Sequence, residues 1–139
     1  MIKTDILVIG SGAAGMSAAI ELSENFEVTL ITKNSLIDSS TWYAQGGIAA
    51  VIDDNDTIEE HLRDTLIAGD GLCNETAVRE CVSHGEEAIN WLASLGTNFT
   101  QDKSSENFHL TQEGGHSKRR VVLLKMQRVK KFLALSLTL

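Results

Sequence analysis

The sequence predicts an α/β fold that opens with a strand, a helix and a second, parallel strand. Three observations support this: an apolar run at residues 6–9, glycines in G-x-G-x-x-G spacing directly after it, and a run rich in β-branched residues at 28–31. A short apolar run bounded by glycine is typical of a buried parallel strand. The segment TDILVIGSGAAGMSAAIELSENFEVTLITK is therefore interpreted as a Rossmann-like βαβ unit.

Each glycine of this fingerprint has a steric reason. Gly10 allows the sharp turn from strand to helix, Gly12 lets the backbone approach a pyrophosphate, and Gly15 lets helix and strand pack closely. The helix from Ala13 onward directs unpaired N–H groups and the positive end of its dipole at the phosphates. We therefore predict that residues 10–15 cradle a dinucleotide.

The second strand lacks the acidic residue that usually holds a ribose hydroxyl about 20 residues past the glycines. Thr32 and Lys33 stand there instead, which disfavours an ordinary NAD site. Lys33 could face a phosphate, as in NADP binding, or lie along an adenosine ribose. A solvated lysine after a strand is the plain alternative, and the residues alone leave all three interpretations open.

The composition favours one domain and excludes several functions. A chain of 139 residues can bury a core of its own, and it has no run of about 18 apolar residues that would span a membrane. Residues 1–113 carry all 19 acidic residues against five basic ones, which disfavours nucleic-acid binding. Asp5 and the glycines fit a first strand better than a signal peptide, so we expect a cytoplasmic protein.

A second glycine-containing segment follows the βαβ unit. Residues 42–50, WYAQGGIAA, predict a loop whose backbone N–H groups meet a ligand. An ordinary turn is the alternative.

The middle of the chain predicts helices. The acidic run 53–56 lacks the central glycine and distal glutamate of a calcium loop, so we interpret it as a turn before a helix over about residues 57–68. In that helix His61 is expected on the surface, since no second histidine or cysteine stands at metal spacing, and we expect no metal. Asn74 is a candidate helix cap, and residues 87–95 form an amphipathic stretch with Trp91 in the core.

The last polar stretch combines a hairpin signal with an acid and a base. Residues 98–100 and 108–111 flank a polar connection and predict a β-hairpin or a long loop. The sequence then runs Glu113, Gly114, Gly115, His116 and Ser117. A carboxylate and an imidazole beside flexible glycines could place an acid and a base near a ligand. The chemistry alone slightly favours a plain polar turn.

Four motifs together resemble those of a known family. They are VIGSGAAG, TWYAQGGIAAV, DTLIAGDGLC and HLTQEGGHSKRR, in this order within residues 4–122. On these motifs the chain resembles the N-terminal part of the L-aspartate oxidases, within the succinate dehydrogenase and fumarate reductase flavoprotein family. The resemblance implies the N-terminal part of a Rossmann-like FAD-binding domain over residues 1–122, with helical segments and a β-hairpin, and without the capping domain.

The resemblance implies FAD-dependent oxidation of L-aspartate to iminoaspartate, with dioxygen or fumarate as electron acceptor. This is the first step toward quinolinate and NAD, which makes quinolinate synthase a candidate downstream partner. The family's capping domain and downstream carboxylate-binding residues are not among these 139 residues, so we expect this chain alone to be inactive and to hold FAD poorly. A non-catalytic flavin-binding fragment is the alternative from another class.

The resemblance also assigns residues to FAD. The pyrophosphate turn corresponds to Gly10, Ser11, Gly12, Ala13, Ala14 and Gly15. The lysine after the second strand corresponds to Lys33. The flavin-contacting loop corresponds to Ser40, Thr41, Trp42, Tyr43, Ala44, Gln45, Gly46 and Gly47. The dehydrogenases and reductases of the family carry, at the position of Ser40, a histidine bonded covalently to the flavin, so serine implies non-covalent FAD.

Two candidate catalytic residues follow from the last motif. Glu113 matches a glutamate held near the substrate amino group, where it disfavours a dicarboxylate without one. His116 and Ser117 match a histidine and serine near the flavin. Gln112 replaces the arginine usual in the family, which changes the local charge.

Residues 123–139 depart from the family. After RRVV the family continues with a pattern like H-A-x-D-A-T-G-x-x-V, which is not present here. Codons for H-A-E-D-A-T-G-K-E-V encode LLKMQRVKK, the sequence from Leu123 to Lys131, once a single base of the first codon is deleted. We therefore predict that the tail is read in a shifted frame, which sequencing of the gene tests. A basic membrane-surface or partner-binding helix is the alternative.

Overall fold

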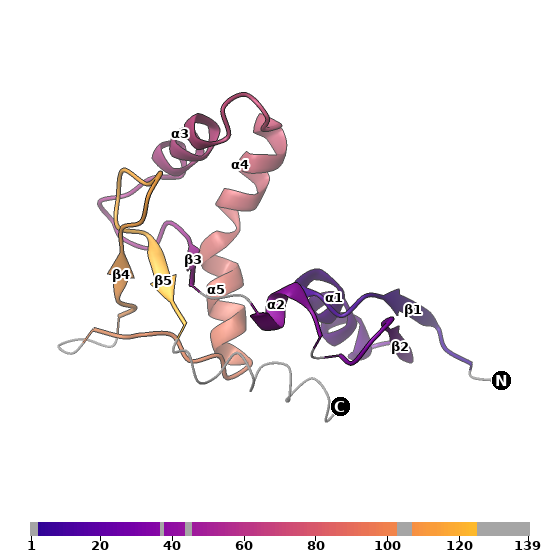
Figure 1. Ribbon diagram of the computed structural model, residues 1–139. Helices are drawn as coiled ribbons and strands as arrows, with labels where there is room; N and C mark the ends of the chain where they lie inside the picture. The colour runs from indigo at the N-terminus through magenta and orange to yellow at the C-terminus, as the bar shows by residue number, and fades with distance from the viewer. Residues whose placement is uncertain (1–2, 37, 44–45, 103–106, 125–139) are drawn as a thin grey trace. The chain divides into compact units, whose positions relative to one another are not determined.

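The computed structural model describes residues 3–36, 38–43, 46–102 and 107–124. These residues fall into two compact units, one up to residue 43 and one from Gly46 onward. Figure 1 shows the helices and strands of both units. Residues 123–139, which are predicted to be read in a shifted frame, lie outside the described residues except for Leu123 and Leu124.

The first unit is the expected βαβ arrangement. Strand β1 (Ile6–Ile9) is followed by helix α1 (Ala13–Ser23), strand β2 (Val28–Ile31) and the short helix α2 (Ser40–Tyr43). The two strands are parallel, with Ile6 opposite Val28 and Ile9 opposite Ile31. The prediction from the apolar runs and the glycine spacing is confirmed.

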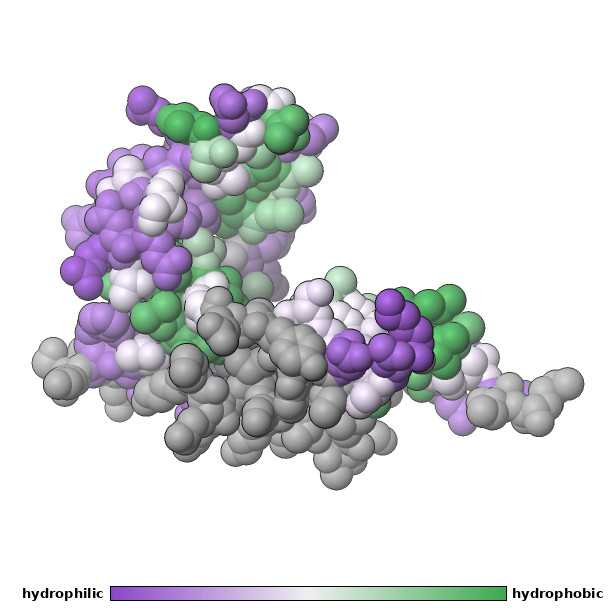
Figure 2. Space-filling model, viewed as in Figure 1, coloured by the Kyte–Doolittle hydropathy of each residue, from purple (hydrophilic) through white to green (hydrophobic). Residues whose placement is uncertain are grey.

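One expectation for β1 is wrong, because the strand is not buried on both faces. Leu7 is 52% exposed and Ile9 is 77% exposed, and Ile31 on β2 is 45% exposed. Side chains alternate between the faces of a strand, and α1 packs on the face that carries Val8. The other face forms the hydrophobic surface over β1 and β2 in Figure 2.

The second unit is built on a small antiparallel sheet in the order β3-β5-β4. Its strands are β3 (Gly47–Ala49), β4 (Leu110–Thr111) and β5 (Val121–Leu123). The prediction of a loop over residues 42–50 is therefore wrong at both ends, where α2 and β3 form. β3 exists because β5, which is far away in the sequence, supplies its hydrogen-bonding partner.

The predicted hairpin is confirmed in the described residues around one bridge, Gln101 to Phe108. Next to it, the backbone N–H of His109 donates to the carbonyl of Thr100 at 2.9 Å. Residues 103–106 lie outside the described residues. The hairpin brings Phe108 against Phe99, with ring centroids 5.5 Å apart in an edge-to-face arrangement.

Three helices complete this unit: α3 (Ile58–Ala68), α4 (Glu75–Ser83) and α5 (Gly85–Ser94). The predicted cap is confirmed, because Asn74 accepts from the backbone N–H of Ala77 at 3.0 Å. The turn before α3 ends in Thr57, whose side chain accepts from the backbone N–H of Glu60. α5 packs Ile89 on the sheet, in a core completed by Ala50, Phe99 and Val122. Trp91, expected in the core, is only half-buried.

No helix in the described part of the chain is both long and apolar enough to cross a membrane.

Candidate functional site

The glycine fingerprint forms an open turn between β1 and α1. Gly10 has φ of 113°, and its backbone N–H donates to the carbonyl of Ile31 at 2.8 Å. A Cβ atom built on Gly10 or Gly12 would meet nothing within 4 Å, so the space in front of the turn is open. On Gly15 a Cβ atom would lie 2.1 Å from the carbonyl oxygen of Gly10. The positive φ of Gly10 and the close contact at Gly15 agree with the steric roles predicted for these two glycines, and the approach of Gly12 to a pyrophosphate stays a prediction.

The N-terminus of α1 suits an anion. Gly12 caps the helix without a side-chain hydrogen bond, and no acidic residue stands in the first turn. Helix N-termini offer backbone N–H groups and a positive dipole end to a phosphate. The residues present therefore fit the pyrophosphate of a dinucleotide.

Two predicted cofactor segments meet at this turn. The backbone N–H of Ala13 donates to the hydroxyl of Thr41 in α2 at 2.9 Å. Ser11 is 4% exposed and its hydroxyl donates to Thr32 at 3.3 Å. The loop that the resemblance assigns to the flavin thus begins beside the cradle.

The remaining cofactor candidates have different surroundings. Ala14, Lys33 and Ser40 are exposed in the first unit. The side chains of Trp42 and Tyr43, and all of Ala44 and Gln45, lie outside the described residues.

Gly46 and Gly47 belong to the second unit. A Cβ atom on Gly47 would lie 2.5 Å from the carbonyl oxygen of Val122, so this glycine is required by the close approach of β3 to β5. Gly46 has φ of 130°, a conformation that favours glycine.

The candidate substrate residues lie on a closed turn in the second unit. The backbone N–H of His116 donates to the carbonyl of Glu113 at 3.2 Å, and Gly115 has φ of 84°. Gln112 donates its side-chain amide to the carbonyl of His116 at 2.8 Å. Gln112, singled out from sequence only as a departure in charge, therefore closes the turn from which the exposed Glu113 projects.

Helix α3 anchors the end of this turn. One carboxylate oxygen of Asp64 accepts from both the backbone N–H and the hydroxyl of Ser117, each at 2.7 Å. Lys118 donates to the carbonyl of Asn55 at 3.0 Å and lies 3.5 Å from the carboxylate of Glu60. The segment after Glu113 is thus tied to α3 and to the acidic turn before it.

The strongest of these ties is a buried guanidinium. Arg120 is 0% exposed; its Nε and Nη2 donate to the two carboxylate oxygens of Asp56 at 2.7 and 2.8 Å, and its Nη1 donates to Asp64 at 2.8 Å. Burial acts to lower the pKa of Arg120, but the hydrogen bonds and charges of the two carboxylates outweigh it and raise the pKa above its ordinary value.

The pKa of Asp64 is shifted in the opposite direction, below its ordinary value. Partial burial acts to raise its pKa, but hydrogen bonds from Ser117 and the charge and hydrogen bond of Arg120 lower it below the ordinary value. Sequence reasoning missed this cluster. The sequence features that form the cluster are the acidic run 53–56 and the basic run 118–120. Neither run shows, from its own neighbouring residues, that it pairs with the other.

The expectation that His61 lies on the helix surface is wrong. Its side chain is buried, with 5% of the residue exposed, and its ring centroid lies 5.6 Å from that of His116. His61, Asp64 and Ala68 share one helix face, which the turn covers. Burial, with smaller contributions from the charges of Arg120 and His116, lowers the pKa of His61 below its ordinary value.

We expect this burial to make folding sensitive to mild acid. Below pH 6.5, the ordinary value, the unfolded chain binds a proton at His61 that the folded chain does not, so the contribution to stability is full above pH 6.5 and is lost as the pH falls. Urea unfolding of this chain at pH 7 and pH 5 measures the loss. The loss should be smaller in His61→Leu; an equal loss in both would contradict this assignment.

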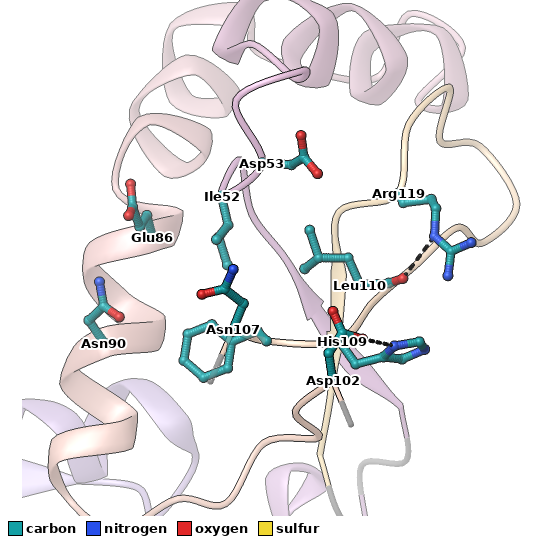
Figure 3. Close-up of a pocket in the computed structure, with 10 residues that line it drawn as sticks. Ile52, Asp53, Glu86, Asn90, Asp102, Asn107, His109, Leu110 and Arg119 are labelled. Carbon is teal, nitrogen blue, oxygen red and sulfur yellow. Dashed lines mark hydrogen bonds and ion pairs between the residues drawn. The ribbon is translucent and has the colours of Figure 1, made fainter. Parts of the chain in front are cut away.

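A separate pocket of about 500 Å³ opens elsewhere in the second unit (Figure 3). Asp102 and His109 point toward one another at its edge, with 2.6 Å between Oδ1 and Nδ1, and Arg119 Nε donates to the carbonyl of Leu110 at 3.0 Å. Because both side chains of the Asp102–His109 pair are more than a third exposed, the pair contributes little to stability. The pocket is lined by Ile52, Asp53, Glu86, Asn90, Asp102, Asn107, Phe108, His109, Leu110 and Arg119, none of them a predicted site residue.

The parallel strand pair, the open glycine turn and the helix N-terminus that begins at Gly12 define a dinucleotide-binding fold of the Rossmann-like class. Comparison with known families agrees with this geometry. The sequence matches the FAD binding domain family over residues 5–135, and the chain belongs to that family.

The most informative relatives are L-aspartate oxidases. The chain is 52% identical to that of Pseudomonas aeruginosa over 124 residues, covering 85% of this chain and 23% of the relative. It is 48% identical to that of Vibrio cholerae over 124 residues, covering 86% and 23%. The chain thus spans less than a quarter of the length of these relatives.

Solved structures show the same fold at lower identity. An E. coli quinol fumarate reductase matches with a TM-score of 0.86 and 28% identity, covering 99% of this chain and 24% of that one. Mycobacterium smegmatis Sdh1 matches with a TM-score of 0.83 and 26% identity, covering 96% and 23%. The fold class predicted from sequence, an FAD-binding domain of the succinate dehydrogenase and fumarate reductase family, is confirmed.

Proposed function

We propose that this chain supplies the FAD-binding and substrate-discriminating N-terminal part of a cytoplasmic L-aspartate oxidase. The reaction is oxidation of L-aspartate to iminoaspartate, with electrons passed to dioxygen or fumarate. The observation that carries the proposal is the identity of about half the residues to L-aspartate oxidases over most of the chain. The product would be consumed by quinolinate synthase.

Non-covalently bound FAD supplies the two-electron acceptor in this reaction. The open turn at Gly10 and Gly12 and the N-terminus of α1 would hold its pyrophosphate. Glu113 would accept a hydrogen bond from the substrate ammonium, since a carboxylate next to an ammonium makes a charge-assisted pair. The turn at Gln112 and Ser117 would hold Glu113 in place.

A chimera provides the test of turnover. It carries residues 1–122 of this chain followed by the remaining chain of the Pseudomonas aeruginosa L-aspartate oxidase. We expect the purified chimera with FAD to produce hydrogen peroxide from L-aspartate in air. A chimera that holds FAD in full but produces none would refute the proposal.

Succinate dehydrogenase or fumarate reductase chemistry is the second candidate function, favoured by the similarity to those solved structures. Ser40 separates the two, because a hydroxyl at this position offers no imidazole to bond covalently to the flavin. We expect acid precipitation of the chimera to release all of its FAD. Flavin that stays with the precipitated polypeptide would favour the second candidate.

Replacing Glu113 tests substrate discrimination. In the chimera, Glu113→Gln should lower the ratio of kcat/KM for L-aspartate to that for succinate by roughly ten- to a hundredfold, the value of one charge-assisted contact. Glu87→Gln, which removes an exposed carboxylate on α5, is the matched control and should leave the ratio unchanged. An unchanged ratio in Glu113→Gln would remove Glu113 from the site.

A further inference from the structure

His61 has a polar atom that its surroundings do not use. Its Nδ1 is buried and has no hydrogen-bond partner among the described residues, and the same holds for Nδ1 of His116. A buried polar atom left without a partner costs stability, typically about 1–3 kcal/mol, so an apolar residue would be the more stable choice at position 61. The position therefore calls for an explanation beyond packing.

The two histidines are placed to act on one another. Their ring centroids lie 5.6 Å apart, with the planes inclined by 59°. Two neutral imidazoles can form one hydrogen bond, with one Nδ1 as donor and the other as acceptor, once the rings turn to face each other. Burial and the nearby positive charge of Arg120 lower the pKa of His61, which favours the neutral ring.

We propose that His61 is a positioning residue that fixes the tautomer of His116 for recognition of a substrate carboxylate. His61 Nδ1–H donates to Nδ1 of His116, so His116 carries its own proton on Nε2. His116 then presents Nε2–H to a carboxylate of a dicarboxylate ligand, while Glu113, three residues earlier on the same turn, faces the ammonium. The hydrogen bond made by one nitrogen of an imidazole ring determines whether the other nitrogen carries the proton.

Helix α3 gives this arrangement a fixed base. On the face shared with His61, Asp64 holds both polar groups of Ser117, and the methyl group of Ala68 lies 3.7 Å from the position of a Cβ on Gly115. Ser117 is thus held by α3, and Gly115 lies beside the same helix. With its backbone held, the His116 ring can reorient only about its side-chain bonds. The hydrogen bond from His61 would therefore determine its orientation.

The inference rests on the proposed function for its ligand, and a binding measurement separates the two. Succinate affinity is measured in the FAD-loaded chimera from the change in flavin absorbance, which needs no turnover. His61→Leu should weaken succinate binding about tenfold, the loss of one hydrogen bond to a charged group. His61→Asn, whose amide nitrogen can occupy the place of Nδ1, should bind succinate within about threefold of the parent chimera.

A double-mutant cycle decides whether His61 acts through His116. We expect His116→Leu to weaken binding as much as His61→Leu does, and the double variant to be no weaker than His116→Leu alone. Additive losses, or full affinity in His61→Leu, would overturn the proposal, as would the absence of saturable succinate binding in the parent chimera. Failure of the proposed function appears separately, as a parent chimera that binds succinate but does not oxidise L-aspartate.

If His61 served only to pack the helix, the variants would show a different pattern of succinate affinities and thermal midpoints. Arg79→Gln, which breaks an exposed ion pair between α4 and α3, is the control for a change in helix packing alone. It should leave succinate affinity unchanged. His61→Leu should keep or raise the thermal midpoint while it loses affinity; a lower midpoint with equal losses in His61→Leu and His61→Asn would show that position 61 serves only packing.

Discussion

Arg120→Met should destabilise this chain by about 3–5 kcal/mol, the usual cost of removing one partner from a buried ion pair. The substitution keeps an unbranched side chain of similar length but leaves the carboxylates of Asp56 and Asp64, with side chains 2% and 12% exposed, without their cation. Urea unfolding of the chain, followed by circular dichroism, measures the change.

Two variants separate the buried charge from the loss of side-chain bulk. Arg79→Met breaks an exposed ion pair, so it should cost much less stability than Arg120→Met. Adding Asp56→Asn and Asp64→Asn to Arg120→Met should recover most of the lost stability, since uncharged amides need no counter-ion. If Arg120→Met and Arg79→Met cost the same, the cluster is not the anchor described here.

Gly15→Val should abolish FAD binding by the chimera, with a loss of at least a hundredfold in affinity. A Cβ atom at this position would lie 2.1 Å from the carbonyl oxygen of Gly10, which is backbone and cannot rotate away. The helix must then move off the strand, which displaces the N–H groups at the N-terminus of α1 from the phosphates. Flavin fluorescence quenching during titration with FAD measures the affinity.

An exposed position further along the same helix provides the control. Ala18→Val adds a branched side chain to α1 outside the pyrophosphate turn, so it should lower FAD affinity much less than Gly15→Val. Equal losses in the two variants would mean that helix propensity, and not the contact with Gly10, explains the effect.

The parts of the molecule that could be predicted from sequence have local causes. The glycine spacing, the apolar runs at β1 and β2 and the Asn74 cap each act over a few residues, and the structure bears them out. The exposed face of β1 was not predicted, because a continuous apolar run does not show how many faces of the strand are covered.

The parts that were missed depend on contacts between distant residues. β3 and β5 are three-residue strands with no measurable periodicity, and each forms because the other is present. The burial of His61 depends on a turn more than fifty residues further along the chain, which covers its helix face. Single-sequence reasoning singled out Glu113 and His116 as candidates for an acid and a base but had no means of pairing their turn with α3.

The separation of Asp56 and Arg120 along the chain also sets an order of assembly. The two residues lie 64 positions apart, so their contact closes a long loop, and the entropy of that closure must be overcome before the contact stabilises anything. The helical pair α3 and α4 needs only local contacts and can form early. We therefore expect the turn that carries Glu113 to acquire its anchor late in folding, when residues 117–120 reach a helix that is already in place.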